Sequence, residues 1–290
     1  MQTHRPLPSI AKALKNIETG QWRARELAEQ CLARITERNG DVQAFLASDA
    51  AQVRSQADAV DAGTRGGLLR GIPYGVKDVI ETAAYPTTHG SPIYADHRTG
   101  RDAACVALSQ EQGGVLLGKV ATSEFATQTP GPARNPLNLA HTPGGSSSGS
   151  AAAVADGMAM AAWGTQTTGS ITRPAVYCGV VGYKPTFGLV STAGVGVLSP
   201  LQDTVGVLTR TVADAGAMVL GIHGQRYRPA PADVRYRVGV CLSTQWQYAS
   251  SGAIDALRSW AARLAGAGVE VTEVILPSDY EALIDRKSVV

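Results

Sequence analysis

The sequence predicts an α/β protein, and two observations carry this prediction. From residue 69 onward, short apolar runs alternate with helical stretches rich in small residues. Near the end of the chain, residues 236–275 have the pattern of one β-α-β unit. With 290 residues, of which 44% are hydrophobic and 17% charged, the chain can bury a substantial core in one large domain or two small ones.

Composition and charge argue against several classes of protein. The 26 Lys and Arg residues nearly balance the 24 Asp and Glu residues, so a nucleic-acid-binding protein is not expected. Residues 1–8 contain no apolar signal segment, and the apolar run at residues 151–163 is interrupted and too short to cross a bilayer. The cysteines are far apart and form no C-x-x-C pair for a zinc or dithiol site: Cys31, Cys105, Cys178 and Cys241. We expect a cytoplasmic protein with free thiols.

Residues 1–68 are predicted to form a helical cover over the rest of the chain. Ser9 is suited to cap a short first helix. A second helix is predicted over residues 24–38, where apolar residues recur on one face and Asn39-Gly40 follows as a stop signal. A third helix, polar and rich in alanine, is predicted over residues 48–61.

Residues 69–220 are predicted to form the main α/β core. Its strands are expected in the short apolar runs at residues 72–79, 115–117, 158–163, 180–183 and 205–208. Its helices are expected at residues 103–112, 150–155 and 212–220. Residues 221–276 are interpreted as an extension of the same domain, with strands at 236–242 and 269–275 and a helix between them at 253–265.

A lysine interrupts the first apolar strand of this core. The run Gly71-Ile-Pro-Tyr-Gly-Val-Lys77-Asp78 places Lys77 among residues that are expected to be buried. Burial would lower the pKa of the ammonium group and make it a usable general base. The alternative is a lysine at the strand end that pairs with Asp78 or extends to water.

Two segments rich in serine and glycine are candidates for catalysis. Residues 142–150 lead directly into an alanine-rich helix, so their backbone N–H groups could face a ligand; the alternative is a flexible serine linker. Residues 164–175 follow a strand and crowd small residues around Ser170, as an oxyanion-hole loop would. The alternative for this second segment is an ordinary strand-to-helix turn.

Two familiar motifs are rejected. Gly145–Gly149 matches the G-x-S-x-G elbow of α/β-hydrolases, but no strand precedes it and the downstream sequence offers only His223 as a partner. Gly113–Lys119 matches most of a phosphate-binding loop, but Val120 replaces the Ser or Thr that binds magnesium. Neither motif therefore defines the chemistry.

Taken together, three segments resemble the amidase signature family. They are residues 71–78, residues 144–155, and residues 164–175 leading into Tyr-Cys-Gly-Val-Val-Gly-Tyr-Lys-Pro-Thr at 177–186. The resemblance covers residues 9–276 and implies a mixed central β-sheet with helices on both faces, with residues 69–220 as the catalytic core. Members of the family are longer, so the C-terminal part is expected to be missing, and residues 277–290 form an atypical tail.

The resemblance also implies a catalytic triad. Ser170 is then the nucleophile, Ser146 is the bridging serine after a cis peptide bond, and Lys77 is the terminal base. The oxyanion would be bound by four consecutive backbone N–H groups: those of Thr167, Thr168, Gly169 and Ser170. The expected reaction forms an acyl-enzyme on Ser170 and then hydrolyses it, without a metal or an organic cofactor.

The chain departs from the family pattern close to this triad. Gln166 and Thr172 replace an aspartate and an arginine, which we interpret as a compensated loss of one charge pair. Arg173 lies one position from the usual arginine, and Thr168 replaces a glycine and would be strained if that position requires a positive φ. Five residues are candidates for substrate contacts, and the alternative for each is a packing role: Tyr74, Thr122, Ser123, Gln128 and Tyr177.

The leading hypothesis is a cytoplasmic hydrolase of C–N bonds in non-peptide linear amides. A second hypothesis is the amidase subunit of a tRNA-dependent amidotransferase complex, and a third is an inactive fragment that only binds a ligand or a partner. The expected partners are a small amide substrate and water, without direct contact to nucleic acid or membrane. A homodimer is a candidate assembly.

Overall fold

The computed structural model describes residues 6–231, 234–277 and 279–280. Its contacts divide the chain into two compact units, one ending at Arg228 and the other beginning at Pro229. The boundary therefore lies eight residues after the one expected at residue 221. That the second unit continues the same domain stays a prediction, and each unit is described here by itself.

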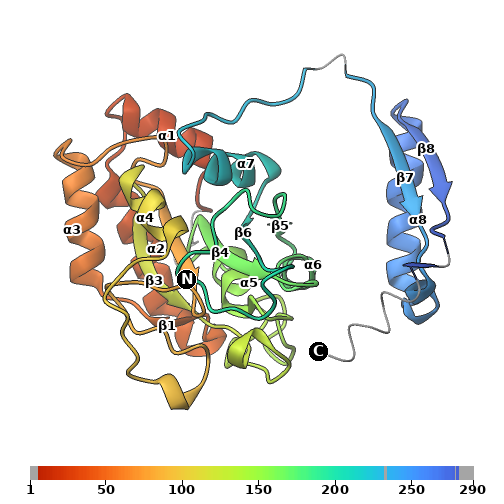
Figure 1. Cartoon of the computed structure of the whole chain (residues 1–290). Coiled ribbons are helices and arrows are strands. Elements are labelled where there is room, and N and C mark those ends of the chain that lie inside the picture. The colour runs from red at the N-terminus through yellow and green to blue at the C-terminus, as the bar shows by residue number, and fades with distance from the viewer. Residues whose placement is uncertain (1–5, 232–233, 278, 281–290) are drawn as a thin grey trace. The chain divides into compact units, whose positions relative to one another are not determined.

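A six-stranded mixed sheet forms the centre of the first unit (Figure 1). In spatial order its strands are β1 (Phe45–Ala47), β3 (Val115–Val120), β2 (Pro73–Lys77), β4 (Ala161–Gln166), β6 (Thr204–Thr209) and β5 (Val181–Tyr183). Strand β2 runs parallel to both of its neighbours, β3 and β4, whereas β1, β6 and β5 join by antiparallel pairing. The mixed sheet expected from the resemblance is confirmed.

Seven α-helices surround this sheet in the described part of the first unit. They are α1 (Ile10–Glu18), α2 (Ala24–Val42), α3 (Ala50–Asp61), α4 (Ala104–Glu111), α5 (Ser148–Ala155), α6 (Thr172–Cys178) and α7 (Val212–Gly221). Side-chain oxygens accept backbone N–H groups at the first turns of three of them: Ser9 at α1, Asp49 at α3 and Thr211 at α7. Short 3₁₀ turns lie at Pro92–Tyr94 and Glu124–Ala126.

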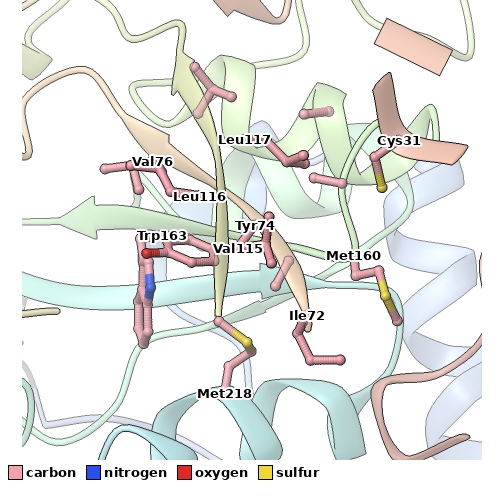
Figure 2. Close-up of a cluster of buried hydrophobic side chains, with 14 of the residues drawn as sticks. Cys31, Ile72, Tyr74, Val76, Val115, Leu116, Leu117, Met160, Trp163 and Met218 are labelled. Atoms are coloured by element: carbon pink, nitrogen blue, oxygen red, sulfur yellow. The ribbon is translucent and has the colours of Figure 1, made fainter. Parts of the chain in front are cut away.

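The two faces of the sheet carry different side chains because residues alternate along each strand. Tyr74 and Trp163 are fully buried in the larger core, which also includes Met218 of α7 (Figure 2). The Trp163 indole N–H donates to Ser109 Oγ of α4 at 2.9 Å, so its polar atom is satisfied there. A second core cluster joins Ala162 and Leu208 to residues of α5 and α6. Helices therefore cover both faces, as expected.

Several element boundaries differ from those that the sequence predicts. Helix α2 continues past Asn39-Gly40 to Val42, because the Asn39 side chain bonds the backbone N–H and carbonyl of Phe45 instead of ending the helix. Strand β4 occupies Ala161–Gln166 rather than residues 158–163, and β3 extends to Val120. Helix α6 directly follows the Ser170 segment and is not among the helices predicted from the sequence.

The second unit contains the expected β-α-β arrangement. Strands β7 (Arg237–Cys241) and β8 (Glu270–Val274) pair in parallel. Helix α8 (Ser251–Gly266), drawn in blue in Figure 1, lies between them in the sequence. Cys241 on β7 is exposed, whereas Cys31, Cys105 and Cys178 of the first unit are buried free thiols. The predicted tail at 277–290 lies mostly outside the described residues. Among the helices that are described, none has the length and apolar character needed to cross a membrane.

Candidate active site

Lys77 is the last residue of β2, and its side chain is fully buried. Its Nζ donates to Ser146 Oγ at 2.7 Å and to Thr165 Oγ1 at 2.8 Å. Burial lowers the pKa of Lys77 to about 7, while the negative charge of Asp203 acts in the opposite direction. A buried lysine with two hydroxyl partners and a pKa near neutrality can accept a proton at physiological pH.

The alternative interpretation, an ion pair between Lys77 and Asp78, is wrong. Asp78 instead faces Lys119 of β3, with 3.3 Å between Nζ and Oδ1, and both side chains are buried. Lys119 Nζ also donates to Thr87 Oγ1 at 2.9 Å and to the Ile80 carbonyl. Because the Asp78 carboxylate is paired with Lys119, Lys77 has no ion-pair partner within the described ranges.

The serine loop, residues 142–150, is held in place by hydrogen bonds and is not a flexible linker. The Gly145–Ser146 peptide bond is cis. Ser147 Oγ bonds the Thr165 carbonyl at 3.1 Å and Ser150 Oγ bonds the Trp163 carbonyl at 3.1 Å, so hydroxyls of the loop and of the first turn of α5 are tied to β4. No strand enters this loop in the described chain, and Val115–Val120 is a strand, so both rejected motifs lack the structure that they require.

Ser170 lies beside this loop at the end of the segment that follows β4. Its carbonyl accepts the Ser147 N–H at 3.1 Å, which joins the two serine segments directly, and the residue is 8% exposed. Within the part of the chain that the structure describes, no hydrogen bond joins Ser170 Oγ to Ser146 Oγ. The structure thus brings Lys77 into contact with Ser146 and places Ser170 next to them. Such contacts often tighten only when substrate binds.

The segment between β4 and α6 presents free backbone donors. Gln166 Oε1 accepts the N–H groups of Ile171 and Thr172 at 2.8 and 2.9 Å, at the start of α6. Among the described loop hydrogen bonds, none uses the N–H groups of Thr168, Gly169 or Ser170. Thr168 has no positive φ, so the strain considered for this position is absent.

Asp203 is a residue of this site that sequence reasoning missed. Its Oδ1 accepts the Thr167 hydroxyl, and its Oδ2 accepts the N–H groups of Leu198 and Ser199, each at 2.8 Å. It is 9% exposed and is the charge that raises the pKa of Lys77 against the effect of burial. Asp203 stands alone in a polar turn, so no local pattern could have revealed it.

A pocket of about 380 Å³ opens beside the serine loops. Three of the candidate contact residues, Ser123, Gln128 and Tyr177, line it, together with Gly145 and Arg173. That the first three bind substrate stays a prediction.

The two other candidates for substrate contacts, Tyr74 and Thr122, are not among the residues that line this pocket. Tyr74 is fully buried near the Val106 carbonyl, and Thr122 is fully buried with its hydroxyl bonded to the Ser123 carbonyl. Within the described residues, no group of three or more His, Cys, Asp or Glu side chains could hold a metal ion.

Comparison with known proteins decides the family. The model of the family described as Amidase matches residues 26–285. The chain belongs to the amidase family. The chain resembles the A subunit of glutamyl-tRNA(Gln) amidotransferase from Roseiflexus castenholzii, with 43% identity over 225 residues, which are 74% of this chain and 46% of that protein. It therefore spans about half the length of this curated relative.

Solved structures of amidases share the fold. Peptide amidase from Stenotrophomonas maltophilia superposes with a TM-score of 0.82 and 33% identity, over 93% of this chain and 62% of that one. The A subunit of glutamyl-tRNA(Gln) amidotransferase from Thermotoga maritima gives a TM-score of 0.78 and 30% identity, over 96% of this chain and 63% of that one. Both are longer than the present chain.

The departures of this chain from the family pattern are accommodated by local hydrogen bonds. Gln166 and Thr172 still contact each other, because Gln166 Oε1 also accepts the Thr172 hydroxyl at 3.3 Å. Arg173 turns toward the serine loop, where its Nε and Nη2 donate to the Gly145 carbonyl at 2.9 and 2.6 Å. The arginine thus contacts the residue that precedes Ser146.

Proposed function

We propose that this chain hydrolyses a carboxamide C–N bond of a linear, non-peptide amide through a Ser–Ser–Lys triad. Ser170 is the nucleophile, Ser146 relays its proton, and Lys77 receives it. The observation that carries the proposal is the buried Lys77 Nζ, 2.7 Å from Ser146 Oγ, with a pKa of about 7. The chain spans about half of its curated relative, so the activity of the complete protein is part of this proposal.

The proposed reaction balances its protons within the triad. Ser170 Oγ attacks the amide carbon while its proton passes to Ser146, whose own proton passes to neutral Lys77. The tetrahedral intermediate expels the amine or ammonia, which takes up the proton that Lys77 returns through Ser146. Water then attacks the acyl ester by the same route and releases the carboxylic acid.

The negative charge of the intermediate needs preorganised donors. The N–H groups of Thr168, Gly169 and Ser170 take part in none of the described loop hydrogen bonds, and the Thr167 N–H precedes them in the same turn. Gln166 supports this arrangement because its side chain binds the next two N–H groups and caps α6. We assign the oxyanion to these four donors.

The test combines a covalent probe with turnover. A fluorophosphonate should label Ser170 in the 290-residue chain, and a panel of linear amides should be hydrolysed. Ser170→Ala should abolish labelling, and Lys77→Ala should reduce hydrolysis by about 10²–10⁴-fold, the usual contribution of a general base. Equal rates in wild type and Lys77→Ala would contradict the mechanism.

The name of the sequence relatives favours a second candidate, the amidase component of an amidotransferase that uses ammonia on a tRNA-bound amino acid. Glutamine would then be the amide that Ser170 attacks. The two candidates differ in their need for partners: release of ammonia from glutamine by the chain alone would argue against the complex. The absence of labelling and of turnover would instead support the third hypothesis, a fragment that only binds. A homodimer stays a prediction.

A further inference from the structure

Arg173 is the one charged residue among the described residues that line the pocket beside the serine loops. The other lining side chains are neutral, and those with polar atoms include Ser123, Gln128 and Thr142. No carboxylate of the lining therefore compensates the guanidinium. An arginine without a compensating acid in a concave site favours an anionic group in the ligand.

The orientation of this guanidinium leaves a binding edge open. Nε and Nη2 lie on one edge of the planar group, and both donate to the Gly145 carbonyl. The opposite edge is formed by Nη1 together with the second hydrogen of Nη2. Within the described chain, the hydrogen bonds of the Arg173 side chain use Nε and Nη2, and none uses Nη1. Two parallel N–H groups on one edge match the two oxygens of a carboxylate.

The same contact positions the charge relative to the reacting atoms. Gly145 precedes Ser146 in the chain, and Arg173 follows Ser170 by three residues, with its own N–H bonded to the Gly169 carbonyl at 2.9 Å. Gly145 also lines the pocket. A ligand group bound to the open edge of Arg173 would thus be attached to a molecule whose amide lies near both serines.

We propose that the substrate carries a carboxylate in addition to the scissile amide, and that Arg173 binds this carboxylate through its Nη1/Nη2 edge. Arg173 is then a specificity-determining residue, and the substrate class is the monoamides of dicarboxylic acids and related acidic amides. This inference rests on the proposed function, because it assigns the substrate of the same site. A guanidinium that served only to hold the Gly145 carbonyl would give no preference for anions.

The test compares matched amides by binding. Succinamate and glutaramate are each paired with the neutral amide of the same chain length in which an isopropyl group replaces the carboxylate. Calorimetry on the Ser170→Ala chain should show binding of the acidic amide that is roughly 10–100-fold tighter than that of its neutral partner, as expected for a charge-assisted bidentate contact. In the Ser170→Ala, Arg173→Gln chain this ratio should fall to about one.

Two further variants separate the contact from general electrostatics. Arg173→Lys keeps the charge but loses the planar fork, so the ratio should fall only part of the way. Arg134→Gln removes an exposed cation next to the lining residue Ala133, and the ratio should be retained. A change in the position of Ser146 in the Arg173 variants would affect both amides equally, so it cancels in the ratio of the affinities for the acidic and the neutral amide.

Turnover distinguishes this inference from the proposed function. Hydrolysis of acidic and neutral amides at equal kcat/KM would support the amidase and overturn the anion site. Preferential binding that requires Arg173, without hydrolysis of any amide by the wild-type chain, would support the anion site and overturn the proposed function. Binding of neither amide, or a preference that survives Arg173→Gln, would also overturn the inference.

Discussion

Lys77 is buried at a place where its protonated form is costly, and this determines the expected pH dependence. Below a pKa of about 7 the side chain carries its proton and cannot accept one from Ser146; above it, the amine is neutral. We therefore expect kcat/KM for a neutral amide to rise with pH through about 7. The measurement is a profile of kcat/KM between about pH 5 and pH 9, which reports the free enzyme. A profile that is flat across this range would contradict the assignment of Lys77 as the base.

The negative charge of Asp203 opposes the effect of burial on the pKa of Lys77. Because its charge raises the pKa of Lys77, Asp203→Asn should move the rising limb of the pH profile to lower pH. Thr167→Val is the matched control, since it removes the hydroxyl that bonds Asp203 but retains the carboxylate charge. A limb that moves equally in both variants would indicate that the hydrogen bond, rather than the charge, is responsible.

Among the elements, α5 owes its position to the absence of a side chain at Gly149. A Cβ there would lie 2.2 Å from Ala121 N and 2.6 Å from Ala44 O, both of which are backbone atoms. Gly149→Ala should therefore lower the free energy of unfolding by about 1–3 kcal/mol or more and reduce labelling of Ser170 by the probe. Urea denaturation and the labelling rate would measure the two effects. Unchanged stability would mean that α5 can shift without cost.

Gly40 in α2 provides the contrasting substitution in the same unit. It is exposed and helical, and a Cβ there would meet nothing within 4 Å. Gly40→Ala should raise the free energy of unfolding by roughly 0.5–1 kcal/mol through helix propensity and leave labelling of Ser170 unchanged. The same denaturation series measures this gain, and a loss of stability would contradict the open environment at this position.

The elements and the residues of the candidate site differ in how far the sequence predicts them. Most strands and helices follow from apolar alternation and capping residues, but their ends depend on tertiary contacts: α2 passes Asn39 because that side chain bonds Phe45. Lys77 and the two serines stand out through their segments. Asp203 does not, because its role arises only when a distant turn folds against Thr167. The carbonyl contact of Arg173 has no local signal either.

At the scale of the whole molecule, the proposed machinery lies in one unit. Lys77, Ser146, Ser170 and Arg173 all precede Arg228, where the first compact unit ends. Residues 229–231 and 234–236 form neither helix nor strand. We expect trypsin to cleave after Arg235, whereas the Arg228–Pro229 bond resists trypsin, and we expect the resulting N-terminal fragment to keep its reactivity toward the fluorophosphonate. Mass spectrometry of the labelled fragment checks this. Loss of labelling on cleavage would show that the second unit supports the triad.

The distribution of thiols makes the second unit separately observable. Burial raises the pKa of Cys31, Cys105 and Cys178 to about 12, so these residues are poor nucleophiles, whereas Cys241 on β7 is exposed. A maleimide dye added to the native chain should attach at Cys241 alone among the described cysteines. Its fluorescence would then follow the β-α-β unit during unfolding or partner binding, while the covalent probe on Ser170 would report independently on the first unit.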